Sequence, residues 1–197
     1  MIKKTIIIIL YLLSIISCSK KLYNQNINKD NIMNNNENIK YAYFSSGCFW
    51  GTEYWFEKSD GVISVISGYA GGHKVNPTYR EVCTGLTGHL ETVKVAYDTE
   101  KTTYEELVKL FFETHDFTQK NGQGPDIGSQ YLSAIFYQNQ EEKEIAEKYV
   151  NILRERKYDV ATAIREYKNF YEAEDYHQDY YTKKGSMPYC HFYTKIF

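Results

Sequence analysis

A cysteine stands at the junction between a predicted strand and a predicted helix. The apolar run 41–44 predicts the strand, Gly47 allows a tight turn, and residues 49–58 predict a helix that begins directly after Cys48. The first turn of a helix has backbone N–H groups without partners and carries a partial positive charge. This position favours the thiolate form of Cys48, which acts as a nucleophile. We therefore expect redox or nucleophilic chemistry at Cys48.

The order of the other predicted elements limits the fold. Apolar and β-branched runs predict strands, and capped amphipathic segments predict helices. The strands are expected at 41–45, 62–69, 89–98 and 133–137, and the helices at 49–58, from Thr103 onward, and from Asn139 to Arg156. This β-α-β-β-α-β-α order predicts an α/β (α+β) ferredoxin-like two-layer sandwich with a mixed sheet. A last strand at 161–167 and a long irregular tail, with a short helix near 175–183, should follow.

One carboxylate lies on an apolar face of a predicted strand. In the strand 89–98, Glu91 falls on the same side as Val93 and Val95. An isolated carboxyl group in such surroundings is desolvated, which favours its neutral form and suits a proton donor. The alternative is a strand glutamate that snorkels toward water or pairs with a lysine or arginine.

The N-terminal residues differ in composition from the rest of the chain. Residues 1–17 consist of a short basic start and an apolar stretch, followed by Cys18, and they resemble a bacterial lipoprotein signal peptide. That resemblance implies cleavage before Cys18 and lipid attachment there, and hence an exported, envelope-anchored protein. An ordinary secretory signal or an uncleaved anchor is the alternative. Residues 18–38 are rich in Asn and predict a flexible tether, so the domain should span 39–197.

Length, charge and cysteine count exclude several classes of protein. The 197 residues suit one domain, and a formal charge of −2 argues against binding of nucleic acid. The four cysteines form no Cys-x-x-Cys pair, and the five histidines show no metal-ligand spacing. We therefore expect no metal and no thioredoxin-type motif.

Several motifs occur together and in a specific order. They are Gly47-Cys48-Phe49-Trp50, Ser67-Gly68-Tyr69-Ala70-Gly71-Gly72, Tyr79-Arg80-Glu81-Val82-Cys83, Gly88-His89-Leu90-Glu91, His115-Asp116, residues 122–131 and residues 173–178. In this set the chain closely resembles the A-type peptide methionine sulfoxide reductases, from about residue 43 to residue 190. Any one motif is weak, whereas the ordered set is specific.

The resemblance implies a thiol mechanism without an organic cofactor or metal. It makes Cys48 the nucleophile, Glu91 the acid and Cys190 the resolving cysteine. The implied reaction reduces methionine-S-sulfoxide, in proteins or free, through a Cys48 sulfenic acid and a Cys48–Cys190 disulfide. A thioredoxin-like donor, exported with the enzyme, would then reduce the disulfide. We expect the enzyme to act as a monomer and the Cys190 segment to be flexible.

The resemblance also implies a substrate pocket. Phe49 and Trp50 would hold the S-methyl group, Tyr79 and Tyr131 would donate hydrogen bonds to the sulfoxide oxygen, and Asp126 would bind through water. Each residue has a structural alternative, because the chain contains 20 tyrosines and Asp126 lies in a glycine-rich turn. For the remaining cysteine, Cys83, we expect a small buried thiol in or beside a strand.

The sequence departs from the family pattern in three places. Pro125 stands where Asn is usual, Leu132 replaces an Arg found in many members, and no Gly-rich segment with a second recycling cysteine follows Cys190. Proline lacks a backbone donor, which puts the loop near Asp126 in doubt. A single resolving cysteine is the simpler expectation.

Two other functions are compatible with parts of the sequence. A non-catalytic surface lipoprotein or binding module could keep the fold, and it would not need Glu91 or Cys190. A thiol hydrolase would pair Cys48 with a histidine, but no Gly-x-Cys-x-Gly elbow is present. The joint presence of Cys48, Glu91, Tyr79, Tyr131 and Cys190 favours the reductase.

Overall fold

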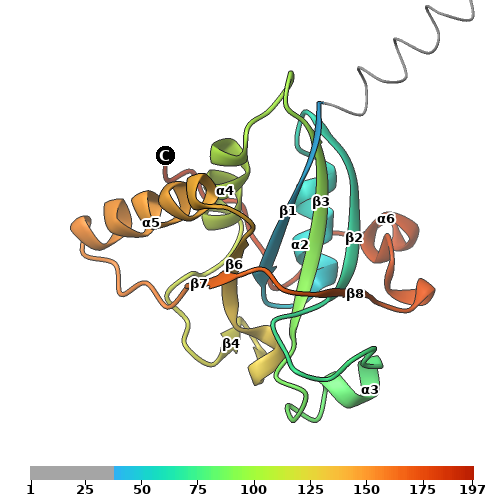
Figure 1. The fold of residues 1–197 in the computed structure, drawn as a ribbon. Coiled ribbons are helices and arrows are strands. Elements are labelled where there is room, and N and C mark those ends of the chain that lie inside the picture. Colours follow the sequence, from blue (N-terminus) through green and yellow to red (C-terminus); the bar gives the residue numbers. More distant parts are fainter. Residues whose placement is uncertain (1–37) are drawn as a thin grey trace, which may run out of the picture. The chain divides into compact units, whose positions relative to one another are not determined.

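The computed structural model describes residues 38–197. The predicted signal peptide, the lipidation site at Cys18 and nearly all of the predicted tether lie outside the described residues. Within the described part, one sheet has six strands in the order β7-β6-β1-β3-β2-β8, and a small hairpin pairs β4 with β5 (Figure 1). The strands are β1 (Ile39–Ser46), β2 (Val62–Ala70), β3 (Leu90–Asp98), β4 (Gly122–Gln123), β5 (Asp126–Ile127), β6 (Ser133–Tyr137), β7 (Ala163–Glu166) and β8 (Phe170–Glu172).

The helices complete the predicted ferredoxin-like core. They are α2 (Phe49–Glu57), α3 (Tyr79–Val82), α4 (Tyr104–Glu113), α5 (Gln140–Glu155) and α6 (Tyr180–Lys184), with short 3-10 turns η1 (Ser129–Tyr131) and η2 (Asp175–His177). The succession β1-α2-β2-β3-α4-β6, with the sheet order β6-β1-β3-β2, is the βαββαβ arrangement expected from the sequence. The sheet is mixed as predicted, because β6 pairs antiparallel with β1 and parallel with β7.

Aromatic residues fill the space between the sheet and its helices. Phe44 of β1 stacks on Phe56 of α2, with ring centroids 4.9 Å apart, and on Phe111 of α4 at 5.5 Å. On the other face, Tyr43 stacks at 4.1 Å on Tyr167, in the segment between β7 and β8 that crosses the sheet (Figure 1). Successive residues of β1 are therefore buried on opposite faces, which fixes the strand that leads to Cys48.

Two predicted helix starts are confirmed by their caps. The Thr103 hydroxyl accepts a hydrogen bond from the N–H of Glu106 at 3.2 Å, and the Asn139 side chain accepts one from the N–H of Glu142 at 3.0 Å. Each cap contributes about 1 kcal/mol by occupying a backbone donor that the helix leaves free. The bounds of α4 and α5 follow from these local signals.

The C-terminal third differs from the prediction in detail. The strand expected at 161–167 is shortened to β7, because the N–H of Ala161 bonds to the carbonyl of Phe117 instead of a strand. The helix expected near 175–183 is divided into η2 and α6 by Asp179, whose φ of 54° is left-handed. The short elements α3, β4, β5 and β8 were not predicted.

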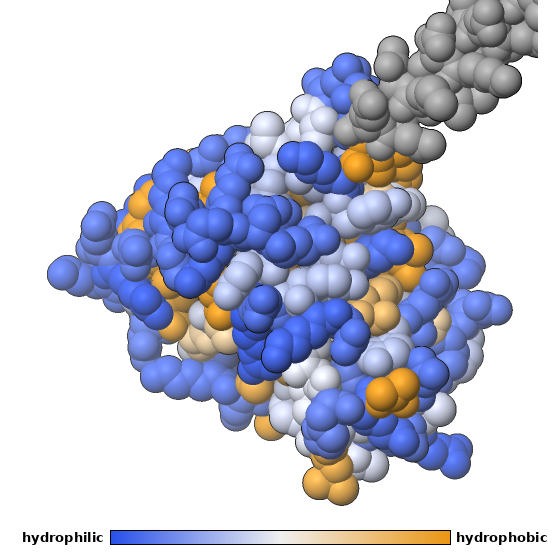
Figure 2. All heavy atoms as spheres, viewed as in Figure 1, coloured by the Kyte–Doolittle hydropathy of each residue, from blue (hydrophilic) through white to orange (hydrophobic). Residues whose placement is uncertain are grey.

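The described domain contains no candidate membrane span. No helix among residues 38–197 combines the length and apolar character needed to cross a bilayer. On the face shown in Figure 2, hydrophilic residues predominate and hydrophobic residues are scattered in small groups. The large apolar side chains are instead gathered in the core on either side of the sheet.

Candidate active site

Cys48 occupies the N-cap of α2, as the sequence predicts, but its thiol is not shifted toward thiolate. The side chain is 8% exposed, and the pKa of Cys48 is raised well above its ordinary value. The largest cause is the neighbouring Cys190 thiol, followed by burial, while the negative charge of Asp126 adds to the shift. The N–H of Trp50 lowers the pKa, which is the expected effect of the helix start, but burial beside a second thiol outweighs it.

Glu91 lies directly beneath the start of the same helix. Its side chain is 1% exposed, and its Oε2 accepts a hydrogen bond of 3.0 Å from the backbone N–H of Phe49. Its Oε1 is buried without a hydrogen-bond partner. Burial, and then the charge of Cys48, raise the pKa of Glu91 well above the usual range of a carboxyl group. Burial therefore favours the neutral form of this carboxyl group, the direction that the strand pattern predicts.

Cys190 lies beside Cys48 and is held in place. Cys190 is the largest influence on the pKa of Cys48, and both residues are free thiols. Cys190 is 4% exposed, and its carbonyl accepts a 3.0 Å hydrogen bond from Nε2 of Gln123. The expectation that the second sulfur must travel to reach the first is not needed, because packing and a hydrogen bond already place Cys190 beside Cys48.

Aromatic side chains form one wall next to Cys48. Phe49 is fully buried, and its ring centroid lies 5.0 Å from that of His177. Trp50 is half-buried, stacks on Tyr180 with centroids 3.7 Å apart, and donates from Nε1 to Nδ1 of His177 at 3.1 Å. This wall can pack against a methyl group and a sulfur atom.

The two predicted phenols lie within the electrostatic reach of Glu91. Burial raises the pKa of Tyr131 to about 12, and the charges of Glu91 and Cys48 add to this shift. Burial likewise raises the pKa of Tyr79, whose hydroxyl is also hydrogen-bonded to the Cys83 side chain. Both phenols keep their protons at neutral pH and can donate to an oxygen atom. Cys83 itself is exposed at the end of α3, so the expectation of a buried thiol beside a strand is wrong.

Asp126 begins β5 in the small hairpin. Pro125 lies in the two-residue turn of this hairpin, where no strand hydrogen bond needs its missing N–H, so Gln123 still pairs with Asp126. The carboxylate of Asp126 accepts a hydrogen bond of 3.1 Å from the hydroxyl of Tyr189. Leu132 follows η1 and packs against the smaller apolar cluster. The hairpin thus holds Asp126 close to the residue that precedes Cys190.

Two further residues support the site without having been predicted individually. Glu174 accepts hydrogen bonds from the hydroxyl of Tyr69 at 2.8 Å and from the N–H of Tyr79 at 3.0 Å. His177 lies between Phe49, Trp50 and Tyr79, and burial lowers its pKa. The motif 173–178 contains both residues, but only the fold shows that they position the aromatic wall and the first phenol.

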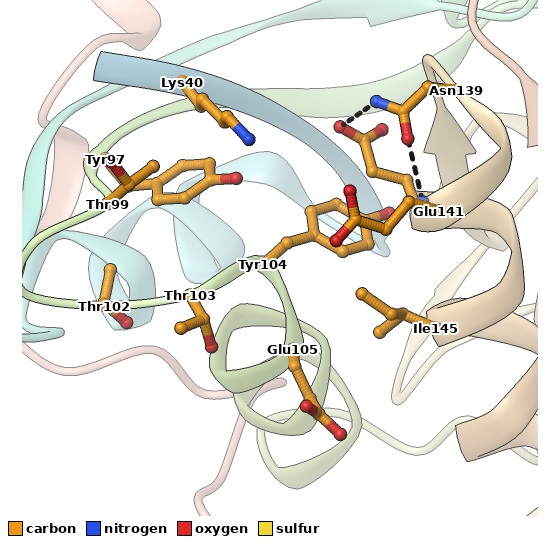
Figure 3. Close-up of a pocket in the computed structure, with 11 residues that line it drawn as sticks. Lys40, Tyr97, Thr99, Thr102, Thr103, Tyr104, Glu105, Asn139, Glu141 and Ile145 are labelled. Carbon is orange, nitrogen blue, oxygen red and sulfur yellow. Dashed lines mark hydrogen bonds between the residues drawn. The ribbon is translucent and has the colours of Figure 1, made fainter. Parts of the chain in front are cut away.

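A separate cavity lies at the other end of β1. It has a volume of about 310 Å³ and lies between Lys40, Tyr97 and the starts of α4 and α5 (Figure 3). Its lining contains hydroxyl and carboxyl groups, as the labelled Thr103 and Glu141 illustrate, but no thiol. None of the predicted substrate or catalytic residues contributes to it.

The described domain matches the profile of a known family. The profile described as Peptide methionine sulfoxide reductase matches residues 40–197. The chain belongs to the peptide methionine sulfoxide reductase family. It is 49% identical over 157 residues to Peptide methionine sulfoxide reductase MsrA of Natronomonas pharaonis, covering 78% of this chain and 88% of that protein. The corresponding protein of Acinetobacter baumannii is 47% identical over 154 residues, covering 78% and 89%.

Solved structures of the family have the same fold. Reduced Mxr1 from Saccharomyces cerevisiae aligns with a TM-score of 0.75 and 34% identity, over 81% of this chain and 94% of that one. Methionine sulfoxide reductase A of Corynebacterium diphtheriae aligns with a TM-score of 0.68 and 39% identity, over 75% and 76%. A structure of Mxr1 in complex with Trx2 aligns with a TM-score of 0.55 and 25% identity, over 81% and 92%. The chain is therefore an enzyme, a methionine sulfoxide reductase with a mixed α/β fold.

Proposed function

We propose that this reductase uses Cys48 as nucleophile, Glu91 as proton donor and Cys190 as resolving thiol to reduce methionine-S-sulfoxide. The observation that carries this proposal is the position of Glu91. Its Oε2 accepts a hydrogen bond from the N–H of Phe49, the residue that follows Cys48, and its Oε1 is buried without a hydrogen-bond partner. A buried polar atom without a partner, beside a candidate nucleophile, marks the place where a substrate atom binds.

The hydrogen bond to Phe49 indicates which oxygen of Glu91 donates the proton. Oε2 accepts from the backbone N–H, so the proton of the neutral carboxyl group belongs on Oε1. Because the pKa of Cys48 is raised, its thiol must first lose its proton to water. The thiolate so formed attacks the sulfoxide sulfur while Oε1–H protonates the sulfoxide oxygen. Tyr79 and Tyr131 donate further hydrogen bonds to this oxygen and so stabilise the charge that develops on it. The hydroxyl group then passes from the substrate sulfur to the Cys48 sulfur as the bond between the two sulfur atoms breaks, so that methionine leaves and Cys48 is left as sulfenic acid.

The proximity of the two thiols supports an intramolecular second step. Cys190 attacks the sulfenic sulfur, water leaves, and a Cys48–Cys190 disulfide forms. Cys190 lies close enough to be the largest cause of the raised pKa of Cys48, so the attack requires little movement of the chain. Asp126 and the Phe49–Trp50 wall would orient the methionine side chain, in free methionine or within a peptide.

A thioredoxin-like protein would return the enzyme to its reduced form. The complex of Mxr1 with Trx2 shows such an association for a relative, and it supports the same recycling here. The Cys48–Cys190 disulfide would be attacked directly by a thiol of the donor. We also propose that the enzyme acts as a monomer.

The S specificity and the recycling can be tested in one assay. The purified chain is mixed with separated S and R sulfoxides of a blocked methionine, in the presence of thioredoxin, thioredoxin reductase and its nicotinamide donor. We expect continuous consumption of the donor with the S epimer alone, and with Cys48→Ser no turnover of either. No turnover by the unaltered chain would favour the alternative, a surface lipoprotein that keeps the fold without the activity.

We propose further that the enzyme is exported and attached to lipid through Cys18. The support is the sequence alone, a short basic start and an apolar stretch that ends at Cys18. Metabolic labelling with a fatty acid, followed by mass analysis of the N-terminal peptide, tests the proposal. Label on the unaltered chain and none on Cys18→Ala is expected, whereas an unlabelled chain released from cells would indicate an ordinary secretory signal.

A further inference from the structure

A buried histidine contacts the resolving thiol in a defined orientation. The Nδ1 atom of His191 lies 3.1 Å from Sγ of Cys190, and its Nε2 atom lies 2.7 Å from the carbonyl oxygen of Ser46. A carbonyl oxygen can only accept, so Nε2 carries the hydrogen of the neutral ring. The lone pair of Nδ1 therefore faces the thiol, and Sγ–H of Cys190 donates to it.

The first turn of α2 leaves room for this ring. A Cβ atom on Gly51 would lie 2.2 Å from Nδ1 of His191, and one on Gly47 would lie 3.6 Å from its Cε1. The indole Nε1 of Trp55 also donates to the carbonyl oxygen of His191 at 3.4 Å. The ring is 1% exposed, so packing and hydrogen bonds on both nitrogen atoms fix its orientation.

We propose that His191 is the general base that takes the proton from Cys190 as this thiol attacks the sulfenic acid on Cys48. This role rests on the function proposed above, because it assigns the base for the second chemical step. His191 touches one of the reacting sulfur atoms and is thus a catalytic residue for disulfide formation. We assign His191 no role in the attack on the sulfoxide.

Several charged or titratable groups surround the ring of His191. They are Cys190, Cys48 beyond it, Asp126 and His115. Burial lowers the pKa of His191 to about 4, so the ring is neutral and able to accept a proton at neutral pH. The Ser46 carbonyl and the charge of Asp126 favour the protonated ring, and they stabilise it while it exists.

The step balances without any additional reactant. The S–H bond of Cys190 breaks as its proton passes to Nδ1, and the sulfur pair forms the S–S bond to Cys48. The S–O bond of the sulfenic acid breaks, and the leaving hydroxide takes the proton from Nδ1 of His191 and departs as water. His191 is thereby neutral again, so that one thiol and one sulfenic acid yield one disulfide and one water.

The two chemical steps can be timed separately in a single turnover. The full chain is mixed with the S sulfoxide in the absence of reductant and quenched with acid at intervals. Released methionine reports the first step, and mass analysis of the sulfenic acid and the Cys48–Cys190 disulfide reports the second. His191→Gln keeps an amide that can donate to Ser46 but lacks a basic nitrogen. Removing a general base typically costs a factor of about 10² to 10⁴. The ratio of disulfide formation to methionine release should therefore fall at least about tenfold in this variant, and sulfenic acid should accumulate.

A second variant and a pH profile separate a base from a packing residue. Gly51→Ala favours the helix but displaces the ring from Cys190, so it should lower the same ratio. In the unaltered chain, disulfide formation should be independent of pH above about 5, because the pKa of His191 is about 4. In His191→Gln the rate should rise with pH, since the Cys190 thiol must then ionise by itself. An unchanged ratio in both variants, or the same pH profile, would overturn the role of His191. Failure of the unaltered chain to release methionine would instead overturn the proposed function.

Discussion

The backbone N–H of Phe49 donates a hydrogen bond of 3.0 Å to Oε2 of Glu91. This contact joins the start of α2, which carries the nucleophile, to the middle of the sheet, which carries the acid. It holds the carboxyl group under Cys48 and leaves Oε1 free for the substrate. A donor and a nucleophile that are fixed to each other in this way approach the same sulfoxide group from defined directions.

Replacing the acid should slow the reaction far more than it weakens binding. In Glu91→Gln the amide oxygen still accepts the hydrogen bond from the Phe49 N–H. The amide group is not an acid, however, and cannot transfer a proton to the sulfoxide oxygen. We expect kcat to fall by a factor of about 10² to 10⁴, with KM changed only a few-fold. Steady-state kinetics with the S sulfoxide measure both quantities, and an unaltered kcat would exclude Glu91 as the donor.

The pH dependence of the same two enzymes gives an independent check. The pKa of Glu91 is raised well above its usual range by burial, so the acid form persists to higher pH than in an ordinary carboxyl group and is lost as pH rises through that pKa. The unaltered chain should therefore lose activity on the alkaline side. The low residual activity of Glu91→Gln should not show this loss, and the same alkaline decline in both would contradict the assignment.

Removal of either phenol should lower kcat. Each of Tyr79 and Tyr131 would donate to the oxygen on which charge develops, and loss of one such donor typically costs a factor of about 10² to 10³. Tyr79→Phe also leaves Cys83 without its partner. Cys83→Ala is the matched control, and it should keep most of the activity. A large loss in this control would show that the thiol, and not the phenol, determines the rate.

Removal of the resolving thiol should lower the pKa of the nucleophile. The neighbouring Cys190 is the largest cause of the raised pKa of Cys48. In Cys190→Ala this cause is absent, so the pKa of Cys48 should fall, while burial still raises it by more than the Trp50 N–H lowers it. The rate of alkylation of Cys48 against pH, followed by peptide mapping, measures the change. Cys83→Ala serves as the control, because Cys83 is not among the groups that shift Cys48, and an unmoved profile in Cys190→Ala would refute this explanation.

A carboxyl cluster behind the aromatic wall should make stability depend on pH. The carboxylates of Glu53, Glu57 and Asp179 lie within 4.8 Å of one another, and burial together with Glu57 raises the pKa of Glu53 to about 8. The folded state therefore binds a proton that the unfolded state releases above about pH 4.5. By linkage, the stabilising proton is fully present at low pH, and stability falls as pH rises from about 4.5 to 8.

Glu53→Gln should remove part of this dependence. Urea unfolding should show the variant to be more stable than the parent at pH 8, by about 1–3 kcal/mol, and nearly equal to it at pH 4. The exposed Glu144 on α5 provides the control, since Glu144→Gln should change stability little at either pH. A parent whose stability does not vary between these pH values would contradict the argument.

Local signals in the sequence were sufficient for much of the fold. Residues close by in the sequence determine the helix caps at Thr103 and Asn139 and the strand that contains Glu91. Each of these is found where the sequence predicts it. The four-residue helix α3 and the two-residue strands β4 and β5 are too short to show a period, and so they were missed. The division of the C-terminal helix depends on the left-handed backbone of one residue, Asp179. Nothing in the surrounding sequence predicts that conformation.

The chemistry of the site depended on contacts that the sequence does not reveal. The helix start alone predicts a low pKa for Cys48, whereas the folded chain brings Cys190 beside it and reverses the shift. Cys83 looked like a buried thiol, but α3 turns it outward. His191 belongs to no motif that the sequence analysis identifies. Its contact with Cys190 depends on the packing of the C-terminal tail against α2.

The most direct test of the central claim is a map of the thiols after one turnover. The full chain is mixed with the S sulfoxide without reductant, the remaining thiols are blocked, and the peptides are analysed by mass. The proposed mechanism predicts about one equivalent of methionine, a Cys48–Cys190 disulfide, and Cys83 still free to react with the blocking reagent. Methionine released while Cys48 remains a free thiol, or a disulfide that contains Cys83 in place of Cys190, would contradict it.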